Sequence, residues 1–322
     1  MNCEGLPSRS GVEAAARRIG QWVTRTPLLP FEWEGRRVWA KAECLQQGGA
    51  FKLRGATNRL LQLSQEERRR GVVAFSSGNH ARGVAIAARR LGIAATIVMP
   101  SDAPAVKRDA TAAEGAEIVA YDRATGDRAA IAAAIAERTG AIVVPSFDDV
   151  HVIEGQGSVG IEIAGQLGFT PPAVLVPCGG GGLSAGIALA LPEAEVVPVE
   201  PAGWDDMVRS LEAGAIVPVG PDAPPTRLDA LQTPLVSPLT FAILHGRGAR
   251  GLAVSDEEAA TATRFAFEHL RLVVEPGGAA ALAALLAGKA GQMREDSVVV
   301  LSGGNVDPAL YSSVLNGFGA GA

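Results

Sequence analysis

The chain has 322 residues, of which 48% are hydrophobic and 20% are charged, and its formal net charge is −5 at pH 7. This length suits about two domains of roughly 150 residues, and the composition excludes a disordered chain. The acidic balance argues against a dedicated nucleic-acid-binding protein, which usually carries a basic excess. The longest apolar run, near residues 279–287, is much shorter than the roughly 18–20 residues that span a bilayer, so no membrane partner is expected.

The N-terminus and the cysteines predict a cytoplasmic protein. Residues 1–4 lack the basic stretch and apolar core of a signal peptide. Cys3, Cys44 and Cys178 are far apart in the sequence and form no CxxC pair. We therefore expect reduced thiols, and neither a disulfide framework nor a zinc site.

Short β-branched runs alternate with alanine-rich helical patterns along the chain. The predicted strands are 38–41, 72–75, 95–99, 117–120, 142–144, 173–176, 196–200 and 298–301. The predicted helices include 81–91, 127–138, 157–167, 183–190 and 257–270. Ser/x/x/Glu capping boxes at Ser10/Glu13, Ser64/Glu67 and Ser255/Glu258 indicate further helix starts. Apolar strands separated by helices predict parallel sheets covered on both faces, which is a doubly wound α/β architecture.

A run of glycines follows the predicted strand 173–176 and opens a helical pattern at Leu183. The glycines are Gly179, Gly180, Gly181 and Gly182. They let the backbone approach a ligand closely, and the helix N-terminus favours a phosphate group. The same stretch also fits a G-x-G-x-x-A dinucleotide fingerprint, and Glu200 ends the next strand about 20 residues on. Spacing alone therefore leaves NAD binding as an alternative.

Lys52 lies among small residues, with Gly48, Gly49 and Ala50 before it and Gly55 after it. A lysine held in such a pocket can be desolvated, and it then forms a Schiff base with an aldehyde or serves as a general base. The alternative is an ordinary surface lysine.

Two further polar turns follow predicted strands. The first, Ser76-Ser77-Gly78-Asn79-His80, follows strand 72–75 and could form an anion-binding nest or simply cap the next helix. The second contains Ser302, which offers a neutral hydrogen-bond donor after strand 298–301. Because ligands bind at the carboxyl ends of strands in open α/β sheets, we expect all these turns at one edge of the sheet.

Together these residues resemble the fold-type II pyridoxal-phosphate enzymes, and within them the threonine/serine dehydratase and serine racemase family. The resemblance runs from Arg25 to Asp307. Its landmarks occur in the family order at residues 49–56, 76–80, 179–182, 275–279 and 302–305. This ordered set is specific for the family and much less specific for the substrate.

The resemblance implies a role for each turn. Lys52 would carry the cofactor, pyridoxal 5′-phosphate, with Phe51 and Asn79 beside it. Asn79 would hold the ring hydroxyl, while residues 179–182 and Leu183 would bind the phosphate. Ser302 would hydrogen-bond the pyridine nitrogen. Because a serine hydroxyl cannot stabilise a pyridinium as a carboxylate would, the ring would be a weaker electron sink, which favours loss of a β-substituent.

The resemblance also implies the substrate contacts. The loop Ser76–Ser77–Gly78–Asn79–His80 would hold the substrate carboxylate, and Lys52 would remove the Cα proton. In racemising relatives, a serine at the position of Ser77 acts as acid and base on the face opposite the lysine. Racemisation is therefore open as a main or side activity.

The segment from Glu200 to Asp206 resembles the divalent-metal segment of the racemase-like branch. Its ligands would be Glu200, Asp206 and the backbone carbonyl of Trp204. A set of oxygen ligands suits Mg²⁺ or Ca²⁺ and not zinc. Since Glu200 cannot serve both roles, this interpretation weakens the NAD alternative.

The chain departs from the family pattern at several positions. Gly48-Gly49-Ala50 lacks the two hydroxyls that the family usually has before Phe-Lys, Arg82 replaces a customary glutamine, and Ala230 stands where a glycine is common. We expect these changes to alter the substrate pocket.

The resulting prediction is a pyridoxal-phosphate lyase with two doubly wound, mostly parallel α/β domains and the cofactor in the cleft. Residues 1–70 and 148–322 would form the large domain and residues 71–147 the small one. The enzyme would deaminate L-serine, L-threonine or 3-hydroxyaspartate to a 2-oxo acid, as a homodimer like many relatives. An amino-acid racemase, a β-replacement synthase and a non-catalytic nucleotide-binding protein are the alternatives.

Overall fold

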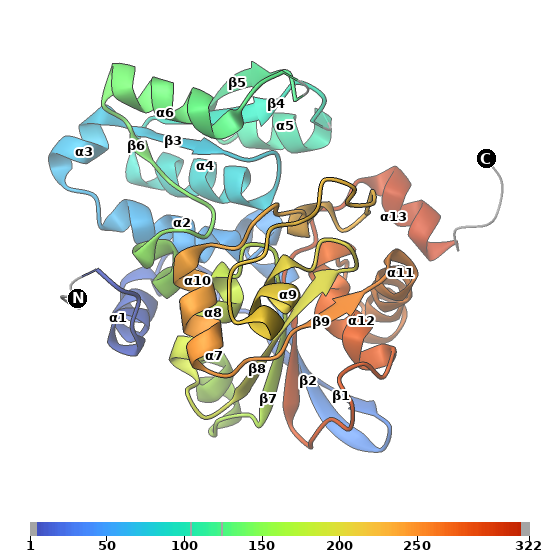
Figure 1. Ribbon diagram of the computed structural model, residues 1–322. Coiled ribbons are helices and arrows are strands. Elements are labelled where there is room, and N and C mark those ends of the chain that lie inside the picture. Colours follow the sequence, from blue (N-terminus) through green and yellow to red (C-terminus); the bar gives the residue numbers. More distant parts are fainter. Residues whose placement is uncertain (1–4, 104, 124, 317–322) are drawn as a thin grey trace.

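The computed structural model describes residues 5–103, 105–123 and 125–316, whose strands form two sheets (Figure 1). The larger sheet has the order β1-β2-β10-β7-β8-β9, in which β1 pairs antiparallel with β2 and the other neighbours pair in parallel. Its strands are β1 (Leu28–Trp33), β2 (Arg36–Ala42), β7 (Ala173–Pro177), β8 (Glu195–Pro201), β9 (Leu252–Val254) and β10 (Ser297–Leu301). The smaller sheet, β5-β4-β3-β6, is parallel throughout. Its strands are β3 (Val72–Phe75), β4 (Ala95–Pro100), β5 (Glu117–Tyr121) and β6 (Ile142–Val143).

Helices join the strands and cover both sheets. The α-helices are α1 (Arg9–Ile19), α2 (Lys52–Leu61), α3 (Gln65–Arg70), α4 (Asn79–Leu91), α5 (Ala105–Ala112), α6 (Arg128–Thr139), α7 (Val150–Leu167), α8 (Gly182–Ala190), α9 (Asp206–Ala213), α10 (Pro238–Gly246), α11 (Asp256–Phe265), α12 (Ala280–Leu286) and α13 (Pro308–Leu315). Shorter turns include η1 (Glu43–Leu45), η2 (Gln47–Gly49), η3 (Asp229–Leu231), the π-helical turn η4 (Ala266–Leu270) and η5 (Gly277–Ala279). None of the helices in the described ranges has the length and hydropathy that a membrane span requires.

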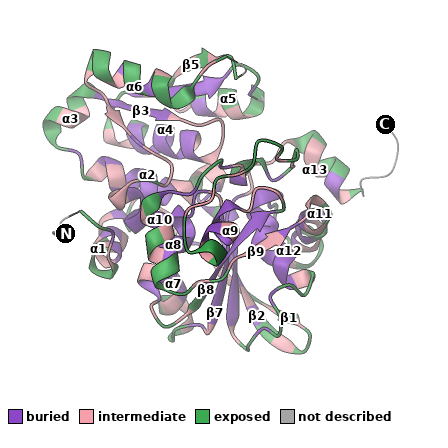
Figure 2. Ribbon diagram, viewed as in Figure 1, coloured by how far each residue is buried: buried purple, intermediate pink, exposed green. Residues whose placement is uncertain are grey.

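Both sheets are covered on their two faces, as the apolar strands predict. In the smaller sheet, Val72 and Ala74 of β3 pack with α4, while Val73 between them packs with α6. In the larger sheet, α11 and α12 cover one face, and α7 and α8 cover the other. Figure 2 shows that central strands of the larger sheet, such as β7 and β8, are buried along most of their length. The predicted doubly wound α/β fold is confirmed.

Each predicted strand is present in the structure, but two strands were missed. β1 has an irregular pattern of half-buried and exposed residues that includes a proline, and β9 has only 3 residues. Short or half-exposed edge strands of this kind carry a weak periodic signal. The helix α7 begins at Val150, earlier than residue 157, because Asp149 caps it by accepting from the N–H of Val152.

Two of the three predicted capping boxes form and one is wrong. Ser64/Glu67 and Ser255/Glu258 each make both hydrogen bonds of the box. The Ser10/Glu13 box is absent because Ser8 caps α1 instead, with an extended backbone and a side chain that accepts from the N–H of Gly11. Ser10 therefore lies inside the first turn of α1.

The predicted ligand-binding turns do not share one sheet edge. The loop that contains Ser76 follows β3 in the smaller sheet, whereas the glycine run and Ser302 follow β7 and β10 in the larger sheet. The single-edge expectation is therefore wrong: the turns come from two sheets and meet across a cavity. Cys44 and Cys178 are free thiols and both are buried, while Cys3 lies outside the described residues.

The strands of the smaller sheet all fall within the predicted small domain, residues 71–147. The helix α2 packs against both α4 and α7, and its Leu53 and Leu60 belong to the core beneath the smaller sheet. The helix therefore joins the two halves, and the exact domain boundary stays a prediction.

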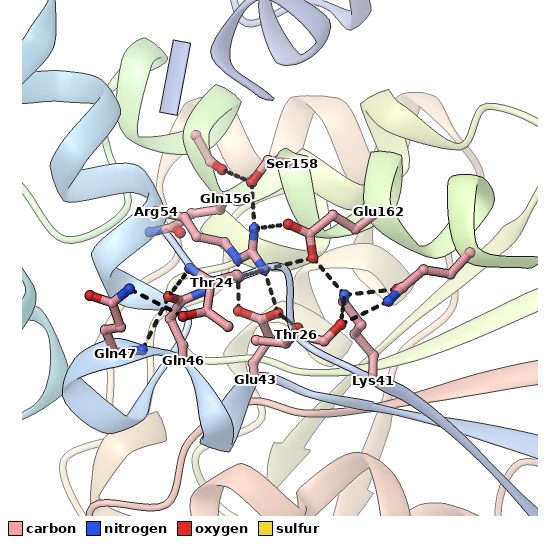
Figure 3. Close-up of polar contacts among 12 residues, drawn as sticks. Thr24, Thr26, Lys41, Glu43, Gln46, Gln47, Arg54, Gln156, Ser158 and Glu162 are labelled. Atoms are coloured by element: carbon pink, nitrogen blue, oxygen red, sulfur yellow. Dashed lines mark hydrogen bonds and ion pairs between the residues drawn. The ribbon is translucent and has the colours of Figure 1, made fainter. Parts of the chain in front are cut away.

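A buried cluster of charges anchors the start of α2 (Figure 3). Arg54, with a side chain that is 0% exposed, donates from Nε and Nη2 to the carboxylate of Glu43 at 2.7 and 2.8 Å. It also donates from Nη1 and Nη2 to Glu162 at 2.7 and 2.9 Å. Glu162 in turn accepts from Nζ of Lys41 at 2.6 Å.

This cluster ties together three distant segments. Lys41 lies near the end of β2 and Glu43 directly follows that strand, Arg54 lies in the first turn of α2, and Glu162 lies on α7. Two cations face two carboxylates, so the buried charges compensate one another. The guanidinium keeps the pKa of Glu43 below its usual range although burial opposes this effect. Because Arg54 is two residues from Lys52, the cluster fixes the position of that lysine.

We predict that Arg54→Met destabilises the protein by about 3–5 kcal/mol, because it leaves two buried carboxylates facing one ammonium group. Arg54→Lys should also destabilise it, since an ammonium cannot chelate both carboxylates. Urea unfolding measures the change. The control is Arg69→Met, which removes an exposed pair with Glu66 at 3.4 Å and should change stability by less than about 0.5 kcal/mol. An Arg54→Met variant that unfolds at the same midpoint urea concentration as the wild-type protein would contradict this prediction.

Candidate active site

A cavity of about 240 Å³ lies where the turns of the two sheets meet. It brings together the predicted cofactor and substrate residues Phe51, Lys52, Ser76, Ser77, Gly78, Asn79, His80, Gly179, Gly180, Gly181, Gly182, Leu183 and Ser302. It also contains Lys107, Phe147 and Asp229, to which sequence reasoning gave no role, together with Arg128 and with Glu275 of the landmark 275–279. No spacing signal could have found these, because they come from elements distant in the sequence.

Lys52 is the first residue of α2 and is half-buried in the cavity wall. Its Nζ donates to the backbone carbonyl of Ser146 at 2.9 Å and lies 5.1 Å from the centre of the Phe51 ring. Burial lowers the pKa of Lys52 from its usual 10.5 to about 8. The amine therefore loses its proton far more easily than a surface lysine does.

Lys52 differs from the other lysines of the chain in its partners. The chain has four lysines, at positions 41, 52, 107 and 289. Three form ion pairs: Lys41 with Glu162 at 2.6 Å, Lys107 with Asp229 at 2.5 Å and Lys289 with Glu258 at 2.7 Å. Among the residues that the structure describes, Lys52 has no carboxylate within ion-pair distance. Such an amine is available for covalent chemistry.

The glycine run forms a turn that excludes side chains. A Cβ at Gly180 would lie 2.4 Å from the ring of Phe147, and one at Gly179 would lie 2.7 Å from Oγ1 of Thr233. Gly181 has a φ of 85° and precedes α8 without a side-chain cap. The first backbone N–H groups of α8 therefore have neither an intrahelical partner nor a capping side chain, which suits a phosphate group.

The loop with Ser76 and Ser77 leads into α4 in a similar way. Asn79 begins α4, and Gly78 precedes it without a side-chain cap, although its own N–H donates to Oγ of Ser76 at 3.2 Å. This helix N-terminus favours a carboxylate. His80 bonds the carbonyl of Val144 through Nε2 at 2.8 Å, so Nε2 carries the proton. Burial and the nearby Lys52 lower the pKa of His80 to about 3, so the imidazole is neutral.

Ser302 joins the larger sheet to the loop that carries Lys52. It is 5% exposed, directly follows β10, and its backbone carbonyl accepts from the N–H of Phe51 at 3.1 Å. Glu275, which is 3% exposed, lies beside it and accepts from Nδ2 of Asn79 at 2.6 Å. Burial raises the pKa of Glu275 to about 7.

The predicted metal ligands lie outside this cavity, at the end of β8 and the start of α9. The carboxylates of Glu200 and Asp206 are fully buried. Glu200 accepts from the N–H groups of Met207 and Val208 at 3.1 and 2.8 Å, whereas neither carboxylate oxygen of Asp206 has a hydrogen-bond partner. Burial raises the pKa of both groups, that of Asp206 to about 6. No three His, Cys, Asp or Glu side chains within the described ranges form a metal-binding group.

The departures from the family pattern lie mostly outside the cavity. Ala230 lines it, whereas Gly48, Ala50 and Arg82 do not. Gly48 has a φ of 79°, and a Cβ there would lie 2.6 Å from Cδ1 of Ile86. This turn therefore requires glycine at position 48.

A family model described as pyridoxal-phosphate dependent enzyme matches residues 19–304. An L-threo-3-hydroxyaspartate ammonia-lyase from Pseudomonas sp is 42% identical, with 97% of this chain and 99% of the relative covered.

Two solved structures are also similar. Maize serine racemase has a TM-score of 0.90 and 34% identity, and the match covers 96% of this chain and 97% of the other. A threonine deaminase from T.th. has a TM-score of 0.86 and 44% identity over 94% and 99% of the two chains. These matches reject the alternative of a non-catalytic nucleotide-binding protein. The chain belongs to the family of pyridoxal-phosphate-dependent enzymes.

Proposed function

We propose that the protein is an ammonia-lyase that converts a small β-hydroxy amino acid into a 2-oxo acid and ammonia. The observation that carries this proposal is Lys52, which has no carboxylate partner among the described residues and lies in a cavity bordered by the uncapped N-termini of α4 and α8. The similarity to the ammonia-lyase of Pseudomonas sp and to the T.th. threonine deaminase supports the same class of reaction.

The residues of the cavity fit the cofactor. The uncapped N-terminus of α8 and its glycine turn would bind the phosphate, and Lys52 would hold the cofactor covalently. Phe51, Asn79 and Ser302 would contact the ring, and Leu183 would contribute to the phosphate site. When bound, pyridoxal phosphate supplies an electron sink that weakens the Cα–H bond of the amino acid.

The chain's own residues would then perform binding and proton transfer. The N-terminus of α4, with Ser76, Ser77 and Gly78 before it, would bind the substrate carboxylate. The amine of Lys52, once the substrate's amino group has displaced it from the cofactor, would take the Cα proton. The electron pair of that C–H bond would then form the Cα–Cβ double bond and the Cβ–O bond would break. The hydroxyl would leave as water with the proton that Lys52 took from Cα. Reaction of the remaining enamine with water gives the 2-oxo acid and ammonia.

Racemisation is a second candidate activity, and Ser77 favours it. Ser77 lines the cavity within the same loop as the proposed carboxylate site. Its hydroxyl could return a proton to Cα on the face opposite Lys52, which would invert the amino acid. The similarity to maize serine racemase supports this side activity.

Arg128 narrows the proposed substrate to 3-hydroxyaspartate. It is exposed, lines the cavity and lies over the ring of Phe75, at 5.9 Å from the ring centre. It has no ion pair with a described residue, in contrast to Lys107, which is paired with Asp229. An unpaired guanidinium is suited to a second substrate carboxylate, which serine and threonine lack.

A divalent cation at Glu200 and Asp206 is part of the proposal. Two buried carboxylates with raised pKa values repel each other, and Arg209 near Asp206 offsets this repulsion only in part. Mg²⁺ or Ca²⁺, bound by both carboxylates, the carbonyl of Trp204 and water, would supply that charge.

We further propose a cytoplasmic homodimer with a small domain at residues 71–147. The exposed apolar side chains Leu45, Phe267 and Val273 support an interface between two copies of the chain. The buried free thiols of Cys44 and Cys178 are consistent with a reducing compartment.

The substrate prediction is tested by oxo-acid release from L-serine, L-threonine and the stereoisomers of 3-hydroxyaspartate. We expect the highest kcat/KM with L-threo-3-hydroxyaspartate. Arg128→Gln should lower that value about 10–100-fold, because a charge-assisted hydrogen bond is lost, and should leave the value for serine unchanged. Arg138→Gln, at the exposed far end of the same helix, is the control and should change neither.

The outcomes separate the candidate activities. Release of no oxo acid from any of these amino acids would overturn the ammonia-lyase proposal. Formation of the opposite enantiomer without oxo acid would favour the racemase. An equal effect of Arg128→Gln on every substrate would show that Arg128 does not select the second carboxylate.

The low pKa of Lys52 predicts how cofactor uptake depends on pH. Because burial moves this pKa from 10.5 to about 8, half of the amine is neutral at about pH 8 and most of it at about pH 9. The rate at which the apo-protein takes up pyridoxal phosphate should therefore rise with a midpoint near pH 8 and level off above about pH 9. Stopped-flow absorbance measures this rate, with Lys52→Ala as the control that shows no uptake phase. A rate that keeps rising to about pH 10 would contradict the prediction.

The metal proposal predicts a link between cation, pH and stability. In the metal-free protein, the raised pKa values favour the protonated carboxyls, so stability should fall as the pH rises through about 6. Mg²⁺ or Ca²⁺ at about 100 times its Kd should restore about 2.7 kcal/mol. Asp206→Asn should abolish this cation effect, while Asp222→Asn in an exposed loop should keep it. Urea unfolding with a chelator and with each cation measures this effect. Equal stability of the wild-type protein with the chelator and with either cation would contradict the proposed metal site.

A further inference from the structure

A chain of side-chain hydrogen bonds runs from Arg82 into the cavity. Nη1 of Arg82 donates to Oδ1 of Asn305 at 2.9 Å. Nδ2 of Asn305 donates to Oδ1 of Asn79 at 2.8 Å and to the carbonyl of Gly48 at 2.7 Å. Nδ2 of Asn79 donates to Oε1 of Glu275 at 2.6 Å.

The direction of every bond in this chain is fixed by chemistry. A guanidinium only donates and a backbone carbonyl only accepts. The bond from Arg82 therefore requires Oδ1 of Asn305 on its side, and the bond to the carbonyl of Gly48 requires Nδ2 of Asn305 on the other side. Nδ2 of Asn305 must then face Oδ1 of Asn79, which leaves Nδ2 of Asn79 directed at Glu275. Since Oδ1 of Asn79 faces Asn305, only the N–H groups of its amide can face the main cavity.

The four residues lie on two sides of the start of α4. Asn79 and Glu275 line the main cavity, whereas Arg82 and Asn305 do not. Arg82 and Asn305 instead line a separate cavity of about 140 Å³, which Asn79 also reaches. Nε of Arg82 is buried without a partner, so the bond to Asn305 is what holds its guanidinium end.

We propose that Arg82 is a positioning residue for cofactor binding, which acts through Asn305 to keep Asn79 as a hydrogen-bond donor to the cofactor ring. This inference rests on the proposed function, in which Asn79 contacts the ring hydroxyl. An obligatory donor stabilises the ionised form of that hydroxyl. Arg82 replaces a glutamine of the family pattern, and a glutamine carries both a donor and an acceptor, so it fixes the direction less strictly.

Glu275 is the last member of the hydrogen-bond chain, and its pKa depends on the orientation of Asn79. Burial raises its pKa to about 7, the hydrogen bond from Asn79 opposes that rise, and the charges of Asp229 and Lys107 nearby act in opposite directions. If Asn79 turned its oxygen toward Glu275, the carboxylate would lose its donor and its pKa would rise further. Disruption of the chain should therefore favour the protonated forms of both Glu275 and the cofactor ring.

The test compares Arg82→Met and Arg82→Lys in cofactor binding and spectra. Arg82→Met should raise the Kd for pyridoxal phosphate about tenfold, measured by fluorescence titration of the apo-protein, and should shift the pH midpoint of the bound-cofactor absorbance upward. Arg82→Lys, which also only donates, should remain within about threefold of the wild-type Kd. Arg89→Met on the same helix removes the ion pair between the exposed Arg89 and the half-buried Glu114 at 2.8 Å, outside both cavities, and should change neither quantity.

A second variant keeps the test decisive if Arg82→Met does not fold. Asn305→Asp preserves the bond to Arg82 but cannot donate to Asn79, so it should raise the Kd and shift the midpoint in the same direction. Wild-type Kd and midpoint in either folded variant would overturn the inference. Equal losses in Arg82→Lys and Arg82→Met, with matching losses of thermal stability, would show a merely structural role. A wild-type protein that binds no cofactor would instead refute the proposed function itself.

Discussion

The buried cluster around Arg54 is the constraint on which the rest of the structure depends. Its two cations and two carboxylates come from β2, from the turn after β2, from α2 and from α7. The cluster therefore holds the larger sheet, α2 and α7 in one arrangement. Burying these charges is costly unless each finds its partner, so the cluster penalises any other placement of α2. The position of Lys52 follows from that placement, because α2 begins at this residue.

Burial in the cavity shifts the pKa values of the titratable groups that line it. Burial lowers the pKa values of Lys52 and His80 and raises that of Glu275. An amine that loses its proton near pH 8, a neutral imidazole and a carboxyl that titrates near pH 7 therefore face one space. The N-termini of α4 and α8 give the same space two sites for anions. The helix ends thus supply charge for binding, and groups that titrate near neutral pH are left for proton transfer.

The sequence predicted the fold well, and it predicted the site through its turns. β7 and residues 298–301 of β10 are apolar throughout, and the turns with Ser76, Gly179 and Ser302 lie at the ends of strands, so local patterns sufficed. The Arg54 cluster and the hydrogen-bond chain from Arg82 to Glu275 were missed because no local pattern pairs their members. Their partners are 11 to 226 residues apart, and only the folded chain brings them together. The predicted capping box Ser10/Glu13 is wrong because Ser8, two residues earlier, caps the same helix.

Identification of the lysine that binds pyridoxal phosphate tests the central claim most directly. The purified protein, loaded with the cofactor and reduced with borohydride, would be digested and its peptides analysed by mass spectrometry. The account predicts a single phosphopyridoxyl adduct on the peptide that contains Lys52, because the other lysines of the chain are engaged in ion pairs. An adduct on Lys41, Lys107 or Lys289 in place of Lys52, or no adduct, would contradict it.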